Sequence, residues 1–343
     1  MTIEILKTGM LTTVQDIGRV GYQKYGVIKS GAMDFEALQI ANGLVGNQKN
    51  EAAIEMTLFG SSFLFEHDTI IALTGADMSP TINGNPIKTY RSILVTKGSV
   101  LKIGQAKKGC RSYLAVAGGI RVPKVMQSYS TYLRAEIGGY DGRPLKKEDS
   151  VHTGEFADDN CKLWDKLSQK LDTDTIFIES DWTVNLHLQP EFSAEPSLRV
   201  FEGREYDWLT SESNQQLFSK AFSVSTESDR MGYRLNGPKL ELKHTEELLS
   251  EPVSFGTVQS PAGGKPILLM ADRQTTGGYA KILQIATVDL PVAAQLKPGD
   301  SFTFQKISHR EAEELYLKRE TELKAFQIGM GLKETHGRSY NEH

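Results

Sequence analysis

The densest group of polar side chains in the chain directly follows an apolar run. Residues 266–270 (PILLM) are typical of a buried strand. Residues 271–279 then supply a carboxylate, a guanidinium, an amide, hydroxyls and a phenol, from Asp272, Arg273, Gln274, Thr276 and Tyr279. A buried polar group without a hydrogen-bond partner costs about 1–3 kcal/mol, so these groups must bind each other, the backbone or a ligand. The segment therefore indicates a binding site. Asp272, Arg273 and Gln274 are its catalytic candidates, and Thr276 and Tyr279 are its ligand-binding candidates.

A second Asp-Arg pair occurs earlier in the same half of the chain. Residues 228–234 (SDRMGYR) place Arg230 directly after Asp229. Arg230 is a candidate for binding an anion, because a planar guanidinium donates two parallel hydrogen bonds to a carboxylate or phosphate. Buried Asp-Arg pairs also occur as structural features that add little net stability. Both interpretations stay open for the two Asp-Arg segments.

The N-terminal region contains a third polar cluster, ahead of an expected helix. Ser30 and Gly31 stand just before Asp34, which can cap a helix through about residue 45. The backbone N–H groups and the dipole at such a start favour an anion, and Arg19 can add a guanidinium. These four residues are therefore site candidates. In the structural alternative, Asp34 merely caps the helix and Arg19 pairs with Asp16 on the surface.

A hydroxyl-rich loop supplies the last candidates. Ser128 and Ser130 are followed by Thr131 and Arg134. Such a loop can bind an acyl or phosphoryl oxygen, or it can simply be solvated, and the residues do not choose between these interpretations. We keep Ser128 and Ser130 as candidates for binding a substrate or an anion.

Composition excludes several classes of function. The 343 residues leave room for about two domains, and the net charge of -4 argues against nucleic acid or an anionic membrane as partner. Cys110 and Cys161 are too few and too isolated for a disulfide framework or a thiolate metal site, and no metal ligands are expected. The first residues lack the apolar segment of a signal peptide, so the expected location is the cytoplasm.

Several common catalytic motifs do not occur in the sequence. There is no GxxxxGK[ST] phosphate loop, no HExxH, no GxSxG and no paired CxxC. No Met-Lys-Met sequence occurs either, so this chain has no biotin attachment site of the usual type.

Short strands separated by glycine turns dominate the chain and favour β-barrels or sandwiches. A tight turn is expected at 82–85, and a hairpin at 93–103 that turns at Lys97-Gly98. Helices are expected from Asp34, over about 206–221, and from Ser308, which forms a capping box with Glu311.

The expected organisation is two β-barrel domains and a terminal helix. The N-terminal barrel domain covers 1–195, including a connecting segment at 141–195, and the second barrel covers 196–307. A helix and tail occupy 308–343. Thr13-Val14-Gln15 recurs as Thr257-Val258-Gln259, a weak echo of a duplication.

These segments, taken in order, resemble one protein family. The sequence is similar to allophanate hydrolase subunit 2 and to the C component of 5-oxoprolinase through 11–34, 73–80, 113–120, 228–238 and 251–279. The same family includes KipA, the antagonist of KipI, and part of the carboxyltransferase region of urea carboxylase. The chain departs from the family pattern at Ile28, where proline is common, at Gln127, where glycine is usual, and at Glu136, where a small residue is usual.

The resemblance implies a fold, an activity and partners. It implies a mainly β protein of tandem cyclophilin-like barrels with a few helices and a C-terminal helix. It also implies one component of an ATP-dependent 5-oxoprolinase that converts 5-oxo-L-proline to L-glutamate, with Mg²⁺ accompanying ATP. The KipI-like B component and the A component of that complex would be its partners. This chain and the B component would together phosphorylate the lactam oxygen, and the chain would be inactive alone. Arg19, Arg230, Arg273, Gln274 and the Ser30 loop are suitable residue types for that step.

Two alternatives follow from the same resemblance. One is a carboxyltransferase-type subunit that uses carboxybiotin from a separate carrier to carboxylate urea or another small amide. The other is a non-catalytic regulator that binds a KipI-like kinase inhibitor.

Overall fold

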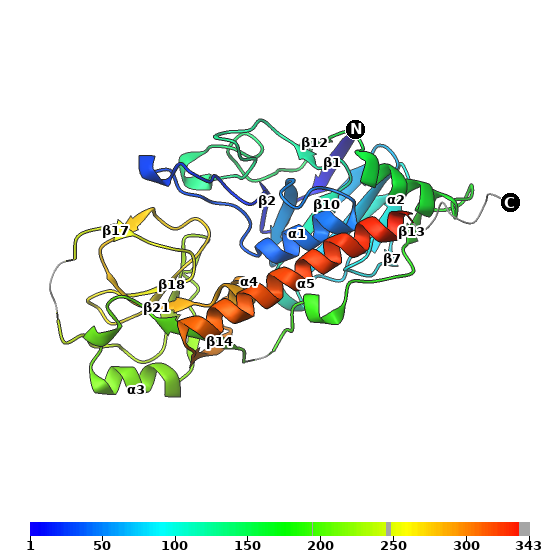
Figure 1. The fold of residues 1–343 in the computed structure, drawn as a ribbon. Helices are drawn as coiled ribbons and strands as arrows, with labels where there is room; N and C mark the ends of the chain where they lie inside the picture. The colour runs from blue at the N-terminus through cyan, green and yellow to red at the C-terminus, as the bar shows by residue number, and fades with distance from the viewer. Residues whose placement is uncertain (194, 245–247, 336–343) are drawn as a thin grey trace. The chain divides into compact units, whose positions relative to one another are not determined.

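The fold is seen in a computed structural model that describes residues 1–193, 195–244 and 248–335. The chain divides into two compact units (Figure 1). The first unit comprises Met1–Gly18, Asp34–Pro190 and the chain from Thr321, and the second comprises Arg19–Met33 and Glu191–Glu320. The prediction of a mainly β fold with a C-terminal helix is confirmed.

The units differ in two places from the contiguous domains expected at 1–195, 196–307 and 308–343. Residues 19–33 group with the second unit, although they stand near the start of the chain. The chain from residue 321 groups with the first unit, although it stands near the end. Of the tail expected after the helix, residues 336–343 lie outside the described residues.

The first unit is built from two β-sheets. Its described strands are β1 (Thr2–Lys7), β2 (Leu11–Gln15), β3 (Ala53–Thr57), β4 (Ser62–Phe65), β5 (Thr69–Asp77), β6 (Thr81–Ile82), β7 (Asn85–Pro86), β8 (Ile93–Val95), β9 (Val100–Lys102), β10 (Lys108–Val116), β11 (Ile120–Arg121), β12 (Ser150–Thr153) and β13 (Phe177–Glu179). One sheet has the order β11-β12-β1-β4-β9-β6-β7, and the other has the order β13-β8-β5-β10-β3-β2. Side chains from both sheets form one apolar core, which includes Ile3, Phe63, Leu73 and Leu114.

Helix α1 (Phe35–Leu44) packs on β5 and β10 (Figure 1). The Asp34 carboxylate accepts a hydrogen bond from Ala37 N at 2.9 Å, so the predicted N-cap is confirmed. Helix α2 (Asp158–Ser168) and the short 3₁₀ turns η2 (Leu133–Ala135) and η3 (Leu186–Leu188) complete the unit. The segment 19–33 therefore ends directly before Asp34, the residue that caps α1.

The hairpin expected at 93–103 is wrong, whereas the tight turn at 82–85 is confirmed. β6 and β7 pair antiparallel across Asn83-Gly84. β8, in contrast, pairs with β5 and β13, and β9 pairs with β4 and β6 in the other sheet. The chain changes sheets at Lys97-Gly98, where Gly98 N donates to Phe65 O and Ser99 N donates to Thr96 O. Local turn chemistry predicts a turn but not which strands then pair.

The second unit contains a closed barrel. Its described strands are β14 (Ser197–Glu202), β15 (Phe222–Val224), β16 (Gly232–Asn236), β17 (Glu251–Pro252), β18 (Thr257–Ser260), β19 (Ile267–Leu269), β20 (Thr276–Gly277), β21 (Ala280–Ile285) and β22 (Ser301–Lys306). The barrel order is β14-β21-β18-β19-β16-β15-β22, closed by the parallel pairing of β14 with β22. β17 and β20 form a separate two-stranded sheet. The barrel core includes Val200, Val258, Leu283 and Phe302.

The helices of the second unit are short except the last. They are η1 (Gln23–Tyr25), η4 (Tyr206–Trp208), α3 (Ser211–Ser219), η5 (Thr287–Asp289), α4 (Leu290–Ala294) and the start of α5 (His309–Thr335). The single helix expected over about 206–221 is corrected to η4 followed by α3, because Thr210 caps α3 by accepting from Ser213 N.

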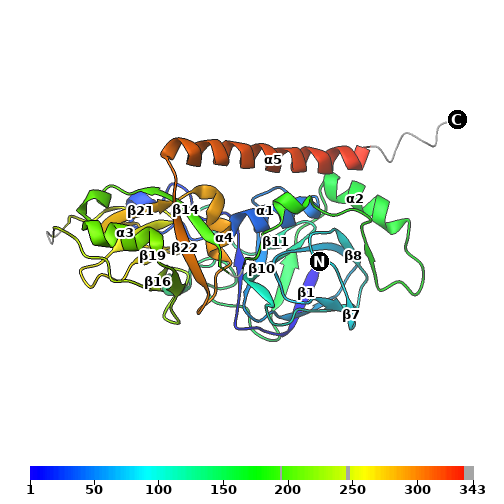
Figure 2. The same ribbon diagram turned by 90° about the horizontal axis from the view of Figure 1, so that it is seen from below.

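Helix α5 is one continuous helix (Figure 2). Ser308 and Glu311 form the predicted capping box: Glu311 N donates to Ser308 Oγ at 3.1 Å, and Ser308 N donates to the Glu311 carboxylate at 2.7 Å. The helix extends to Thr335, so most of the expected helix-and-tail region is helical.

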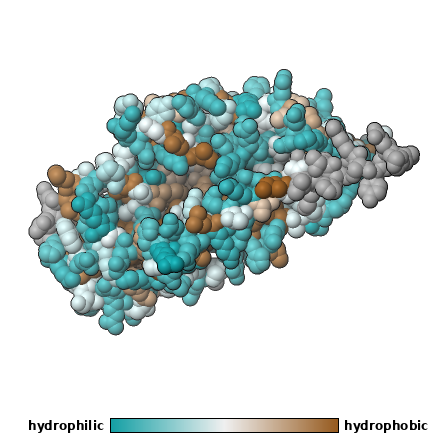
Figure 3. Space-filling model, viewed as in Figure 1, coloured by the Kyte–Doolittle hydropathy of each residue, from teal (hydrophilic) through white to brown (hydrophobic). Residues whose placement is uncertain are grey.

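Hydrophilic residues dominate the surface shown in Figure 3, and hydrophobic residues occur there in small separate groups. In the part of the chain that the structure describes, no helix is long and apolar enough to span a membrane.

Candidate functional site

The two Asp-Arg segments of the second unit are neighbours because β16 and β19 pair. The backbone bonds continue beyond the strands, with Met270 N donating to Met231 O at 2.9 Å and Asp272 N to Arg230 O at 2.8 Å. Asp229 turns away from this contact and caps a tight turn by accepting from Met231 N at 2.8 Å. The result is that Arg230 and Asp272, from different segments, face each other.

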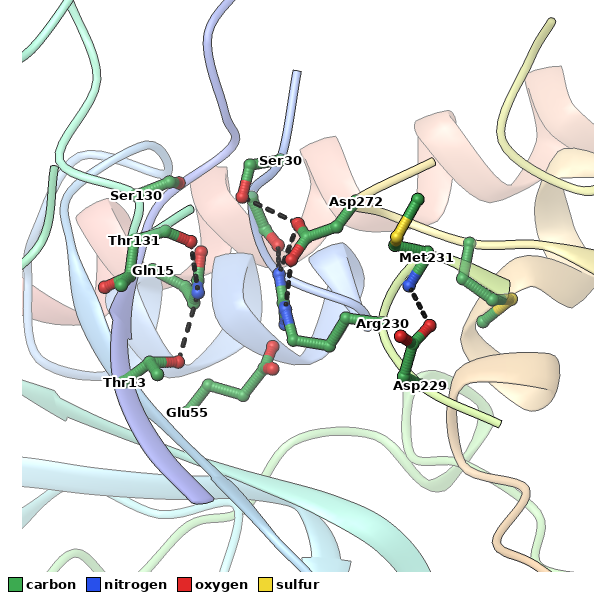
Figure 4. Close-up of polar contacts among 12 residues, drawn as sticks. Thr13, Gln15, Ser30, Glu55, Ser130, Thr131, Asp229, Arg230, Met231 and Asp272 are labelled. Atoms are coloured by element: carbon green, nitrogen blue, oxygen red, sulfur yellow. Dashed lines mark hydrogen bonds and ion pairs between the residues drawn. The ribbon is translucent and has the colours of Figure 1, made fainter. Parts of the chain in front are cut away.

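Arg230 and Asp272 form a buried ion pair that also holds the segment 19–33 (Figure 4). Arg230 Nε and Nη2 donate to Asp272 Oδ2 and Oδ1 at 2.9 and 3.1 Å. Ser30 Oγ donates to Asp272 Oδ1 at 2.7 Å, and Arg230 Nη2 donates to Gly31 O at 2.5 Å. We call these four residues the Asp272 clamp. It matches the structural interpretation of the pair, because the Asp272 oxygens are engaged by protein donors.

The clamp has a further consequence for the backbone at 30–31. Ser30 and Gly31 have φ values of +54° and +97°, in the left-handed region that a serine rarely adopts. The hydrogen bonds of Ser30 Oγ with Asp272 and of Gly31 O with Arg230 hold this conformation. The Ser30 loop is therefore held in a defined shape.

Arg273 has a different environment from Arg230. It is 8% exposed, and its hydrogen bonds go to carbonyl oxygens at long distances, from Nε to Val253 O at 3.3 Å and from Nη1 to Met270 O at 3.4 Å. Its guanidinium also lies 5.8 Å from the centre of the Phe255 ring, and it has no ion pair with any residue that the structure describes. Burial lowers the pKa of Arg273 to about 10, only partly opposed by Asp272. A desolvated guanidinium without a carboxylate partner is suited to bind an anionic group.

The remaining candidates of this segment lie at the surface. Gln274 and Thr276 are exposed, and Tyr279 is 51% exposed. They lie on or beside β20, which pairs with β17. They can contact a ligand or a partner, and their side chains form no hydrogen bond or ion pair with the four residues of the Asp272 clamp.

In the first unit, Asp16 holds the hydroxyl-rich loop. Asp16 Oδ1 accepts from Ser128 Oγ at 2.7 Å and also from Ser130 Oγ, and Oδ2 accepts from Tyr129 N at 2.7 Å. Gly18 N donates to Oδ1 at 2.8 Å. Asp16 and Arg19 are both buried, so the expected surface pair between them is wrong. Ser128 and Ser130 are likewise fully buried, so the interpretation as a solvated loop is also wrong.

Asp34 belongs to a second buried network of the first unit. Its backbone N donates to Tyr113 Oη at 2.8 Å, and Tyr113 Oη donates to Glu55 Oε2 at 2.7 Å. Burial, then Glu55, raises the pKa of the Tyr113 phenol well above its usual value. The phenol therefore stays protonated and links the start of α1 to β3.

The structure thus sorts the candidates predicted from sequence. It brings Ser30, Gly31, Arg230 and Asp272 together, with Arg273 adjacent in the chain. Asp34, Ser128 and Ser130 lie in networks of the first unit, and Arg19 is fully buried in the second, where its N donates to Lys29 O.

Gln259 is a buried polar residue that the sequence analysis did not select as a candidate. Gln259 lies in β18 and is 4% exposed, and its side chain lies against Gly277. The only signal for it was the Thr-Val-Gln echo, which was interpreted as a trace of duplication.

Metal ligands and cavities give two further observations on where a small molecule could bind. Among the described residues, no three His, Cys, Asp or Glu side chains gather as a metal site. A cavity of about 520 Å³ in the first unit lies between the 182–188 loop and α5, lined by Trp182, Leu188, Phe326 and Met330. It contains none of the residues predicted from sequence.

The comparisons with known proteins support the family assignment. The family described as carboxyltransferase domain, subdomain A and B, matches residues 25–306. The chain is 36% identical to the C component of 5-oxoprolinase from Haemophilus influenzae, over 93% of this chain and 95% of that one. It is 38% identical to the C component of 5-oxoprolinase from Escherichia coli, over 90% and 93%.

A solved structure with the same fold is the urea amidolyase of K. lactis. It is 29% identical and superposes with a TM-score of 0.84, over 95% of this chain but only 20% of the longer enzyme. The match therefore relates this chain to one region of that enzyme. By sequence and by fold, the chain belongs to the carboxyltransferase domain family that includes the C component of 5-oxoprolinase.

Proposed function

We propose that this chain is one component of an ATP-dependent 5-oxoprolinase complex that converts 5-oxo-L-proline to L-glutamate. The observation that carries the proposal is the pair of 5-oxoprolinase relatives, because each aligns over at least nine-tenths of both chains. A shared domain inside a larger enzyme would leave most of the relative unmatched. The proposed location is the cytoplasm.

The proposed reaction has two stages. The lactam oxygen of 5-oxoproline attacks the γ-phosphorus of ATP, so that a P–O bond to the lactam forms and the bond to ADP breaks. Water then attacks the activated carbon and the C–N bond opens, which leaves an acyl phosphate that a second water hydrolyses. One ATP, which would carry Mg²⁺, and two waters are consumed, and glutamate, ADP and phosphate are formed.

Arg273 is the residue of this chain that we propose stabilises negative charge in the reaction. Negative charge is carried by the transferring phosphoryl group and by the substrate carboxylate, and both are stabilised by fixed cationic donors in a site with little water. Arg273 is such a donor, since it is buried and its hydrogen bonds go only to carbonyl oxygens. The Asp272 clamp holds the adjacent chain, so we assign Asp272 and Arg230 a positioning role.

The proposed complex needs two further proteins, the KipI-like B component and the A component. We propose that this chain acts with the B component in lactam phosphorylation and that the A component completes the hydrolysis. On this proposal, the isolated chain does not turn over 5-oxoproline.

Reconstitution of the three proteins tests the proposal. We expect ATP-dependent glutamate formation from 5-oxoproline only when all three are present. Arg273→Lys should lower kcat/KM by roughly 10- to 100-fold, because a point charge replaces the planar fork. Glutamate formation that persists without this chain would exclude the proposed role.

A carboxyltransferase function is the second candidate, favoured by the family description and by the urea amidolyase fold match. In that case the chain would transfer a carboxyl group from carboxybiotin on a separate carrier to urea or another small amide. Mixing the chain with a carboxylated carrier protein and urea should then release allophanate, whereas 5-oxoproline and ATP should give no glutamate.

A further inference from the structure

The amide of Gln259 is an unexplained polar group of the second unit. Gln259 is 4% exposed, and its Nε2 is buried without a hydrogen-bond partner among the described residues. A buried donor in this state is destabilising, because it has lost its hydration without gaining a protein partner. Such groups in folded proteins need an explanation, for example a catalytic role or a bound molecule.

The backbone of Gly277 lies directly against this amide. A Cβ atom at residue 277 would lie 2.6 Å from Gln259 Nε2 and 3.4 Å from Val253 Cγ1. A side chain at residue 277 would require the Gln259 amide to shift, so glycine at this position allows the amide to keep its place. The glycine in the Thr-Thr-Gly-Gly-Tyr segment is therefore matched to Gln259 in another strand.

Arg273 reaches the same neighbourhood through Val253. Its Nε donates to Val253 O. Val253 Cγ1 and Gln259 Nε2 both lie within 3.4 Å of the position that a Cβ atom of residue 277 would occupy. Both carbonyl contacts of Arg273 exceed 3.2 Å, the upper end of usual N–H···O distances. Asp272 does not neutralise Arg273, because the Asp272 carboxylate is engaged by Arg230 and Ser30. Two buried side chains around Val253 thus have donors available.

We propose that Gln259 and Arg273 form a subsite for a small carboxylate attached to an amide. Arg273 binds the carboxylate as a cation, and Gln259 Nε2 donates a neutral hydrogen bond to an oxygen of the same ligand. The inference rests on the proposed function, in which 5-oxoproline carries both a carboxylate and a lactam. Allophanate, the product of the carboxyltransferase alternative, has the same chemistry, and the test separates the two ligands.

Ligand binding to the reconstituted complex without nucleotide tests the subsite. The probes are 5-oxo-L-proline, its neutral amide 5-oxo-L-prolinamide, and allophanate, and their binding is measured by calorimetry. We expect wild type to prefer 5-oxoproline, and Gln259→Met and Arg273→Lys each to weaken its binding by about tenfold or more. Arg273→Lys should weaken the binding of prolinamide less, because prolinamide lacks the carboxylate that Arg273 binds. Gln215→Met, on the exposed face of α3, is the matched control and should change nothing.

Thermal stability separates a ligand site from a structural role. Gln259→Met replaces an unsatisfied donor with an apolar side chain of similar length, so we expect the melting temperature to rise by about 2–4 °C. A structural amide, or one satisfied by an ordered water, would instead give a lower melting temperature, and that result would overturn the proposal.

The outcomes distinguish the subsite from the proposed function. If wild type turns over 5-oxoproline and both variants bind it normally, the subsite is wrong and the function stands. If wild type binds allophanate but not 5-oxoproline, and both variants lose that binding, the subsite stands and the 5-oxoprolinase function is wrong. Binding of neither ligand by wild type would contradict both.

Discussion

Each unit of the protein uses one buried aspartate to hold a serine-containing loop, but the two aspartates are neutralised differently. In the first unit, Asp16 is surrounded by hydroxyl and backbone N–H donors from Ser128, Ser130, Tyr129 and Gly18. In the second unit, Asp272 accepts from Ser30 and is paired with the Arg230 guanidinium.

This difference predicts which of the two loops is destabilised more when its aspartate is replaced. Hydroxyl groups can rotate toward other acceptors when a carboxylate is removed, whereas a buried guanidinium that loses its partner keeps its charge. The loop in the second unit should therefore be the more fragile of the two. That fragility lies next to Arg273, the residue we assign to ligand binding.

The largest expected effect is the loss of Asp272. Asp272→Ala should destabilise the second unit by about 3–5 kcal/mol, because it leaves Arg230 as an unpaired buried charge. Asp16→Ala should cost the first unit only about 1–3 kcal/mol, because it removes an acceptor from neutral donors. Hydrogen exchange of the second unit's strands β14–β22, compared with strands β1–β13 of the first unit, measures the two effects separately.

A double replacement provides the control for this prediction. Arg230→Met combined with Asp272→Leu removes both charges and should recover most of the stability. If the double variant is as unstable as Asp272→Ala, the charge argument does not explain the difference between the two loops.

The next effect compares the two Thr-Val-Gln strands. Gln15 Nε2 donates to Thr13 Oγ1 at 3.1 Å and to Thr131 O at 3.2 Å, whereas Gln259 Nε2 has no partner among the described residues. Gln15→Met should therefore destabilise the first unit by about 1–2 kcal/mol, while Gln259→Met should stabilise the second by about 1 kcal/mol. Urea denaturation of the two variants measures the sign directly, and equal signs would contradict the comparison.

A smaller effect comes from the helix caps of the two units. Asp34 caps α1 in the first unit and Thr210 caps α3 in the second, at 2.9 and 3.2 Å. Asp34→Ala should cost about 1–2 kcal/mol and Thr210→Ala about 0.5–1 kcal/mol, because the charged cap is shorter and fully buried. Asp34→Asn, which keeps the acceptor, should recover most of the loss in thermal unfolding.

The smallest effect is a pH dependence at the start of α5. Hydrogen bonds from Ser308 N and then Ser308 Oγ lower the pKa of the exposed Glu311 carboxylate. Because the folded-state pKa lies below the unfolded one, this stabilisation is present above the unfolded value and lost as the pH falls through the folded value. The protection factors of the amides at residues 309–312 should decrease as the pH falls over that range, and Glu311→Gln should remove this dependence.

Much of the local structure could be predicted from sequence. The Asp34 cap, the Ser308–Glu311 capping box and the turn at Asn83-Gly84 depend on residues a few positions apart, so their chemistry is visible in a single segment. Strand pairing was not predictable in the same way. β8 and β9 are joined by a short turn, yet each pairs with strands of a different sheet, because burial of apolar faces decides the partner.

The candidate site shows the same limit. The polar composition of 271–279 predicts a site, but Asp272 and Arg273 have different partners in the structure despite being adjacent. Asp272 lies beside Arg230 through a backbone contact between distant segments, and Arg273 extends to Val253 instead. Gln259 was not predicted, because whether a buried amide has a hydrogen-bond partner depends on residues that are distant in the sequence.

The sequence by itself determined the family and the ends of several helices and predicted the residue types of the candidate site, since these depend on composition and short-range spacing. Only the tertiary structure decided which charges are paired, which donors are left without acceptors, and which unit each segment joins. The physical reason is that burial and pairing depend on contacts between residues far apart in the chain, such as Ser30 with Asp272 and Gln259 with Gly277. Those contacts exist only once the barrel strands have paired.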